Sequence, residues 1–187
     1  METLETISKR CSLKTHLSGK EVEPEKIDTI LNAARLAPSA RNTQTWRFIV
    51  VKDKMVINTL AKTAVTEGNM VISQAPVIIV ICGRARDSAS RDGKDYYLFD
   101  AGLAVENLLL AATELGLATH PMTGISEPEI KGILKIPDDV RVIAITPLAY
   151  PPEASYNEAA KERLGQRERK SLKDITYFNK WGEAEPA

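Results

Sequence analysis

The chain has 187 residues, which fits one ordinary domain, and 43% of them are hydrophobic, enough for a core without disulfide or metal staples. Charged residues make up 27% of the chain, and the positive and negative charges cancel. This balance argues against a general electrostatic attraction to nucleic acid or to an anionic membrane, although it does not exclude a local basic cluster.

Cysteines and histidines are too few and too scattered to organise the fold. Cys11 and Cys82 form no Cys-x-x-Cys motif, and His16 and His120 lie far apart, so neither a metal-ligand spacing nor a disulfide framework is present. The N-terminus has no apolar signal core, and the apolar runs near 75–83 and 101–112 are too short or too interrupted to span a bilayer. We therefore expect a soluble cytoplasmic protein.

The first half of the chain alternates predicted helices and strands. Residues 24–36 are expected to form a helix that begins with Pro24 and is stopped by Pro38, with Ile27, Ile30, Leu31 and Ala34 on one face. A strand at 47–52 and a short helix at 56–66 follow. Residues 76–82 are continuously apolar and β-branched, which predicts a strand buried on both faces and ended by Gly83.

Residues 96–117 predict a long helix with an unusually wide apolar arc, stopped by Gly116. At about 100° per residue, Glu106, Asn107, Thr113 and Glu114 all fall within roughly 120°. One face of a sheet cannot cover the rest of the circumference. We expect a dimer partner to contact it; the alternative is a central helix in a monomer.

The last third predicts two more elements and an arm. Ser126-Glu-Pro-Glu129 is a capping-box pattern that opens a short helix at 127–135, and 140–146 predicts a strand. Residues 153–174 are crowded with charge and predict a solvated arm that takes no part in the core. Because helices and strands interleave and no linker is visible, the class is a mixed α/β single domain.

Several common catalytic motifs are absent from the sequence. There is no Gly-x-Gly-x-x-Gly after a strand, no Gly-Lys-Ser/Thr phosphate loop and no Gly-x-Ser-x-Gly elbow. A Ser-His-Asp triad would need His16 or His120 as its base, and neither lies in a recognisable setting.

Two polar segments carry the positive signal. Arg10, Ser12 and Lys14 alternate, so in an extended segment they point to one side and could clamp a phosphate or carboxylate; the alternative is a solvated basic turn. Residues 37–46 (APSARNTQTW) form a polar loop between a helix and a strand, suited to presenting amides to a flat heterocycle. The alternative is a helix-stop loop with a core tryptophan.

Together with later motifs, these segments resemble the nitroreductase family of FMN enzymes. The later matches are Gln74–Val80, Asp100–Leu117, Pro121-Met-Thr-Gly124, Ile136-Pro137, Tyr150-Pro151 and Arg167-x-Arg-Lys-Ser-Leu172 with Trp181, in order across nearly the whole chain. The resemblance implies an α+β, three-layer sandwich with a mixed, mostly antiparallel central sheet flanked by helices. It also implies a homodimer that exchanges terminal arms. We expect a single domain over 1–187, with 153–187 as a C-terminal arm wrapping the partner subunit.

The resemblance also implies a site for FMN at the dimer interface, built by both subunits. Arg10 and Ser12 would bind the phosphate with Arg167 and Arg169, and Lys14 would lie near the pyrimidine edge, where a cation stabilises the reduced ring. Ser39 and Asn42, with Pro38 and Gln44 as neighbours, would line the ring from the partner. Pro121, Thr123 and Gly124 would pack on the ring, with a backbone N–H directed at N5. The full expected set is Arg10, Cys11, Ser12, Lys14, Pro38, Ser39, Asn42, Gln44, Asn69, Pro121, Met122, Thr123, Gly124, Arg167 and Arg169.

The implied activity is an oxidoreductase that passes hydride from NAD(P)H to a small acceptor, such as a nitroaromatic, quinone or enone, by a ping-pong cycle. Because the hydride chemistry belongs to the flavin, no catalytic side chain and no metal is expected. The alternatives are a flavin-binding protein without turnover (storage or sensing), or a superfamily variant such as a dehalogenase or a flavin-fragmenting enzyme.

Three departures from the family pattern stand out. Cys11 replaces a basic or polar residue and is expected to be a small filler without a redox role. Thr45 stands where proline usually precedes the tryptophan, and Ala149 where glycine is frequent. The polar segment between Gly83 and Tyr96 is short where larger relatives carry helical insertions over the substrate, so we expect a more open or differently covered site.

Overall fold

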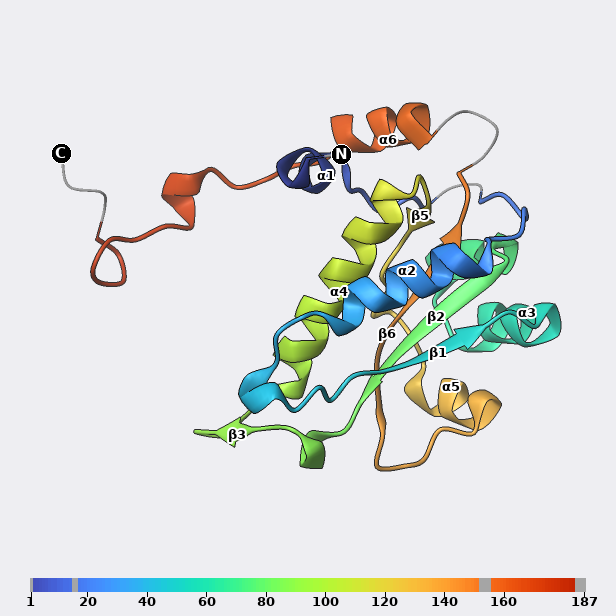
Figure 1. Ribbon diagram of the computed structural model, residues 1–187, viewed down its shortest axis with the longest axis horizontal. Helices are drawn as coiled ribbons and strands as arrows, with labels where there is room; N and C mark the ends of the chain where they lie inside the picture. Colours follow the sequence, from blue (N-terminus) through green and yellow to red (C-terminus); the bar gives the residue numbers. More distant parts are fainter. Residues whose placement is uncertain (1, 15–16, 152–155, 184–187) are drawn as a thin grey trace.

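The computed structural model describes residues 2–14, 17–151 and 156–183. Figure 1 shows a central sheet that runs between two layers of helices. The sheet has the strand order β1-β2-β6-β5, with β1 at Arg47–Val51, β2 at Val77–Gly83, β6 at Arg141–Ala149 and β5 at Ala118–Thr119. All three strand pairings are antiparallel, and a parallel bridge between Ser12 and Thr119 extends the sheet at the β5 edge.

Strand β2 forms the centre of both cores. Its seven residues are all buried, as expected for 76–82. Because side chains alternate along a strand, Ile78 and Val80 pack into one cluster, and Ile79 and Ile81 into another on the opposite face. The expected three-layer α+β sandwich is therefore confirmed.

Helices α2 (Pro24–Arg35) and α4 (Tyr97–Glu114) cover one face of the sheet. Helix α2 begins with proline and buries Ile27, Ile30 and Ala34, as predicted. Helices α3 (Lys54–Thr63) and α5 (Glu127–Leu134) cover the other face. The 3₁₀ helix η2 (Glu67–Gln74) connects α3 to β2, and neither η2 nor β5 was predicted from the sequence. Strand β5 is only two residues long, which is too short to give a recognisable pattern.

The long helix α4 differs from the expectation in how its circumference is covered. Thr113 belongs to the predicted polar sector, yet it is buried and donates its hydroxyl to the Leu109 carbonyl. Helix α1 (Thr3–Lys9) packs on this end of α4, where Thr6 donates to Glu114 at 3.1 Å. At the other end of α4, Leu98 and Phe99 remain more than half exposed. Within one chain, the apolar arc is therefore only partly covered.

The capping box predicted at the start of α5 does not form. Ser126 is the N-cap residue, but its side chain makes no capping hydrogen bond. Glu129, the other residue of the motif, is exposed, and the neighbouring Glu127 accepts three hydrogen bonds from Arg141, at 3.0, 3.1 and 2.9 Å, and one from the Val142 amide at 2.9 Å. A tertiary ion pair with β6 thus replaces the local motif. The helix ends at Leu134, where Lys135 takes a left-handed conformation with φ of 56°.

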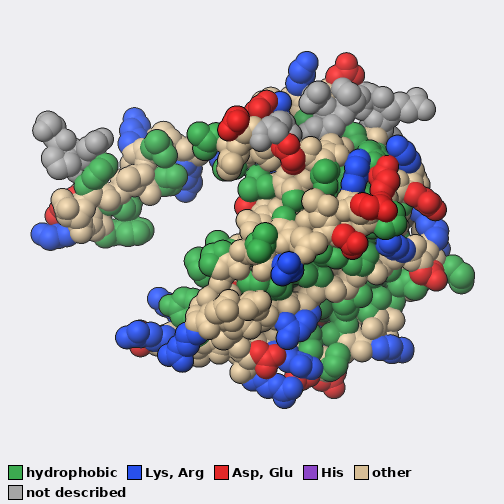
Figure 2. All heavy atoms as spheres, viewed as in Figure 1, with side chains coloured by type: hydrophobic (Ala, Val, Ile, Leu, Met, Phe, Trp, Pro, Cys, Tyr) green, Lys and Arg blue, Asp and Glu red, His purple; other side chains and the backbone are tan. Residues whose placement is uncertain are grey.

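The C-terminal region combines a packed helix with an extended tail. Helix α6 (Tyr156–Gly165) buries Ala160, and Leu164 packs against the same core, so the expectation that 153–174 takes no part in the core is wrong for this helix. The tail after α6 leaves the body of the molecule and includes the 3₁₀ helix η4 (Leu172–Asp174). Figure 2 shows hydrophobic side chains along this tail, and Leu172, Ile175 and Trp181 are among its exposed residues.

Neither a membrane-spanning helix nor a metal-binding cluster is present among the described residues. None of the helices in the described part of the chain is long and apolar enough to cross a membrane. Among the same residues, no group of His, Cys, Asp and Glu side chains has the arrangement needed to hold a metal ion.

Candidate functional site

A basic cavity of about 210 Å³ forms where the N-terminal segment meets the end of α6. Its lining residues are Arg10, Cys11, Ser12, Arg163, Gln166, Arg167, Glu168 and Arg169. Four of them are arginines, and we call Arg10, Arg163, Arg167 and Arg169 the arginine cluster. The structure therefore brings Arg10 and Ser12 together with Arg167 and Arg169, although more than 150 residues separate the two segments.

Hydrogen bonds and an ion pair hold the two sides of this cavity together. Leu13 donates its amide to the Thr119 carbonyl at 3.0 Å, which aligns residues 12–13 with β5. Arg167 donates to the carbonyls of Arg10 at 3.3 Å and Ser8 at 3.1 Å. Arg10 forms an ion pair with Glu106 of α4 at 3.6 Å. The guanidinium groups thus join the N-terminus, α4 and the C-terminal segment around one basic site that suits an anion with several acceptor oxygens.

The loop 121–124 lies next in the chain to the buried strand β5. The Met122 side chain is buried in the core, and its backbone pairs in both directions with Ile145. Thr123 and Gly124 are exposed. A Cβ on Gly124 would lie 3.3 Å from the Asn69 amide nitrogen and 3.4 Å from the Thr66 hydroxyl, so the loop packs closely against η2. Because the Met122 and Cys11 side chains face the core, and the Met122 amide and carbonyl both bond to Ile145, these side chains and the Met122 backbone are not available to a ligand.

His120 lies close to the candidate site, and the sequence analysis did not predict a role for it there. It is 6% exposed, and its Nε2 lies 3.2 Å from Asn69 Oδ1. Burial, with the positive charges of Lys14 and Arg163, lowers the pKa of His120 to about 4. The residue is therefore neutral at physiological pH. Its position directly before Pro121, the first residue of the expected flavin-edge loop, was the one signal in the sequence.

Loop 37–46 lies at the opposite end of α4 from the arginine cluster (Figure 1). The Ala40 amide donates to Asp100 at the start of α4 at 3.0 Å. Arg41, Asn42 and Gln44 all have positive φ, between 48° and 56°, an uncommon state for non-glycine residues that clusters at functional loops. Pro38, Ser39, Asn42 and Gln44 are thus not brought near Arg10 and Ser12 within one chain. Trp46 and Thr45 are buried, which agrees with the alternative interpretation of this segment as a helix-stop loop with a core tryptophan.

Neither cysteine takes part in a disulfide. Both thiols are buried, and burial, together with the charge of Glu127, raises the pKa of Cys82 to about 11. Because the thiolate is the reactive form, Cys82 is a poor nucleophile at neutral pH.

Comparison with known proteins places the chain in a family. The model of the nitroreductase family matches residues 7–150. A putative NADH dehydrogenase/NAD(P)H nitroreductase from Archaeoglobus fulgidus is 35% identical over 167 residues, which cover 87% of this chain and 93% of the relative. The crystal structure of a nitroreductase family protein from Clostridium novyi superposes with a TM-score of 0.77 at 30% identity, covering 98% of this chain and 97% of that one.

Two further matches differ in the chemistry their names describe. An FMN-dependent nitroreductase from Clostridium difficile has a TM-score of 0.75 at 29% identity, with 95% of this chain and 99% of that one covered. Rat iodotyrosine deiodinase 1 is 26% identical over 194 residues, covering 88% of this chain and 68% of the relative. The family match, the relatives and the shared fold agree: the chain belongs to the nitroreductase family of oxidoreductases.

Proposed function

We propose that this protein is an FMN-dependent oxidoreductase that works as a homodimer. In this proposal it passes hydride from NAD(P)H to a small acceptor, such as a nitroaromatic, quinone or enone, in a ping-pong cycle. The observation that carries the proposal is the convergence of Arg10, Ser12, Arg167 and Arg169 on one basic cavity.

The chemistry of the arginine cluster fits the phosphate of FMN. A phosphate monoester carries a charge near −2 at neutral pH and offers three acceptor oxygens, and arginine binds such groups through paired N–H donors. Arg167 already fixes the Ser8 and Arg10 carbonyls, so we assign it to positioning the N-terminal segment as well as to charge. Arg163 was not among the expected residues and joins the proposed phosphate site because it lines the same cavity.

The flavin ring would extend from this cavity toward the loop 121–124. Lys14 is exposed, and its positive charge acts on His120, which immediately precedes that loop. We therefore propose Lys14 as the cation at the pyrimidine edge and a backbone N–H of 121–124 as the donor to N5. When bound, FMN supplies the hydride-accepting centre; the residues of the chain hold it, orient it and exclude water.

A second subunit would complete this site. Loop 38–44 lies at the far end of α4, so it would line the ring only from a partner chain. Leu98 and Phe99 on α4 and Leu172, Ile175 and Trp181 on the tail are exposed apolar side chains that a partner would cover. We propose that the tail wraps around the partner. The hairpin of β3 (Ser90–Arg91) and β4 (Lys94–Asp95), next to the start of α4, would then cover the site in place of a helical insertion.

Reductive dehalogenation is the second candidate, because the chain matches an iodotyrosine deiodinase over most of its length. A flavin-binding protein without turnover is the third. Side chains over the flavin distinguish these activities, and we expect the short segment between Gly83 and Tyr96 to be where the chain departs from larger relatives.

The absorption spectrum of the purified, FMN-saturated protein tests the proposal. We expect a yellow dimer that bleaches anaerobically with NADH or NADPH and recovers its colour when nitrofurazone or menadione is added. A yellow protein that neither donor reduces would favour binding without turnover, and recovery only with an iodophenol would favour dehalogenation. A protein that is colourless as purified, stays monomeric and does not bind added FMN in calorimetry would refute the proposal.

A further inference from the structure

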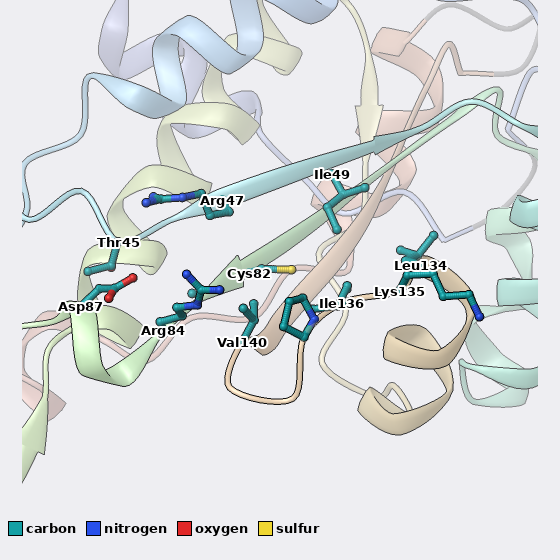
Figure 3. Close-up of a pocket in the computed structure, with 12 residues that line it drawn as sticks. Thr45, Arg47, Ile49, Cys82, Arg84, Asp87, Leu134, Lys135, Ile136 and Val140 are labelled. Atoms are coloured by element: carbon teal, nitrogen blue, oxygen red, sulfur yellow. The ribbon is translucent and has the colours of Figure 1, made fainter.

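A second cavity, of about 280 Å³, lies between the start of β1, the end of β2 and the turn between α5 and β6 (Figure 3). It shares no residue with the arginine cluster. Its lining includes Thr45, Arg47, Ile49, Arg84, Ile136 and Val140. The volume is near the lower end of the range for small-molecule sites in proteins.

The two ends of this cavity differ in polarity. In Figure 3, Ile49, Leu134 and Ile136 lie toward one end, and Thr45, Arg47, Arg84 and Asp87 lie at the other. The Lys135 side chain points away toward α3, so its ammonium group does not belong to the polar end. The cavity would therefore hold a compact molecule with an apolar body and a polar head.

The polar end carries an excess of positive charge. Arg47 donates to the carbonyls of Gln44 at 3.0 Å and Trp46 at 2.8 Å, which fixes its guanidinium beside Thr45. Arg84 shares one carboxylate oxygen of Asp139 with Arg86, at 3.2 and 2.8 Å. Among the described residues, Arg84 and Arg86 pair with the carboxylates of Asp87 and Asp139, and Arg47 forms no ion pair. A polar head that binds here is expected to be an anion.

Two buried polar atoms at this end have no hydrogen-bond partner among the described residues. They are the Thr45 hydroxyl, on a residue that is 2% exposed, and Arg84 Nε, whose contact with Asp139 lacks hydrogen-bond geometry. Native proteins rarely leave buried donors unsatisfied, because desolvation of such a group is costly. Both groups can donate, and a carboxylate would accept from both.

We propose that this cavity binds a small carboxylate with a compact hydrocarbon body. The carboxylate lies between Arg84, Arg47 and the Thr45 hydroxyl, and the hydrocarbon packs against Ile49, Ile136 and Val140. This site is separate from the proposed FMN site and does not depend on it.

Cyclohexanecarboxylate is a suitable probe, with cyclohexylmethanol as the neutral analogue of the same shape. Both are titrated by calorimetry into the full-length, FMN-saturated protein, and methyl-labelled isoleucines report the location by NMR. We expect saturable binding of the acid, at least tenfold tighter than the alcohol, with the largest shifts at Ile49 and Ile136. Absence of saturable binding, or shifts confined to Ile125 beside the loop 121–124, would overturn the proposal.

Three variants make the test specific. Arg84→Gln should weaken the acid about tenfold or more, whereas Arg86→Gln, which removes a neighbouring guanidinium outside the cavity, should change affinity less than threefold. Thr45→Val keeps the shape of the side chain and removes the unsatisfied hydroxyl. It should weaken binding several-fold without lowering the melting temperature. Equal effects of Arg84→Gln and Arg86→Gln, or unchanged binding in Thr45→Val, would show that the acid responds only to general charge.

Discussion

His120 and Asn69 form a side-chain pair whose orientation is fixed by a third residue. The Asn69 amide nitrogen donates to the Thr66 hydroxyl at 3.0 Å and approaches the Gly124 carbonyl at 3.4 Å, so Asn69 Oδ1 faces His120 at 3.2 Å. The proton must therefore be on His120 Nε2, which leaves Nδ1 as a buried acceptor without a partner in the described part of the chain. This pair connects β5, η2 and the proposed flavin-edge loop.

The pKa of His120 predicts a loss of stability at mildly acidic pH. Its pKa is about 4 in the folded state against an ordinary value of 6.5, so between these values the unfolded chain binds a proton that the native state does not. The free energy of unfolding should fall as pH drops through this window, by up to roughly 3 kcal/mol. Urea unfolding of wild type and His120→Gln at about pH 8 and about pH 5 measures the effect. Equal pH slopes in the two proteins would contradict it.

Glu127 predicts a second, more acidic transition. Hydrogen bonds from Arg141 lower the pKa of Glu127 to about 2, so its stabilising contribution is present above pH 4.5 and is lost as pH falls toward 2. Because Arg141 is exposed and partly screened, we expect Glu127→Gln to cost about 1–2 kcal/mol at neutral pH. Glu129→Gln, on an exposed position of the same helix, is the control and should change unfolding by less than about 0.5 kcal/mol. Chemical denaturation of wild type and both variants measures these free energies of unfolding, and equal losses in the two variants would contradict the prediction.

The close packing around Gly124 allows a steric test of the proposed flavin loop. Adding a methyl group in Gly124→Ala would force Asn69 and Thr66 to move by a few tenths of an ångström. We expect the Kd for FMN, measured by fluorescence titration of the apoprotein, to rise several-fold while the fold is kept. Gly68→Ala, whose new methyl group would meet no atom within 4 Å, should bind FMN like wild type. Unchanged binding in Gly124→Ala would exclude this loop from the site.

Variants of Arg167 can distinguish the effect of its charge from its positioning of the N-terminal segment at the proposed phosphate site. Arg167→Lys keeps the positive charge but cannot fork between the Ser8 and Arg10 carbonyls. We expect it to weaken FMN binding about tenfold, and Arg167→Gln to weaken it further. Lys173→Gln in the exposed tail is the charge control. If Arg167→Lys bound FMN as wild type does, charge alone would explain the role of Arg167.

Phe99 predicts a link between assembly and cofactor binding. It is 62% exposed on α4, and Phe99→Glu would place a charge on the surface that we propose to contact the partner. We expect a shift toward monomer in sedimentation velocity and a parallel loss of bound flavin. Met55→Glu is the matched control, since Met55 is an apolar residue on α3 that is 80% exposed. A Phe99→Glu dimer with full flavin content would place the interface elsewhere.

Much of the local structure followed from the sequence, because it depends on contacts between near neighbours. Helix α2 and strand β2 formed where periodicity placed them, since burial patterns of period 3.6 and 2 report which face meets the core. Gly116 ended α4 with a φ of +73° that other residues rarely adopt. The ordered motifs identified the family. Arg10, Ser12, Arg167 and Arg169 line one cavity, and their binding of a phosphate stays a prediction.

Other features were decided only by tertiary packing. Thr113 is buried although it belongs to the predicted polar sector, and the predicted capping box is absent while Glu127 pairs with Arg141 of β6. Helix α6 joins the core through Ala160, which a charged sequence conceals. His120 acquired its neutral state from burial beside Lys14 and Arg163. Each of these depends on residues far apart in the chain, whose approach no local pattern encodes.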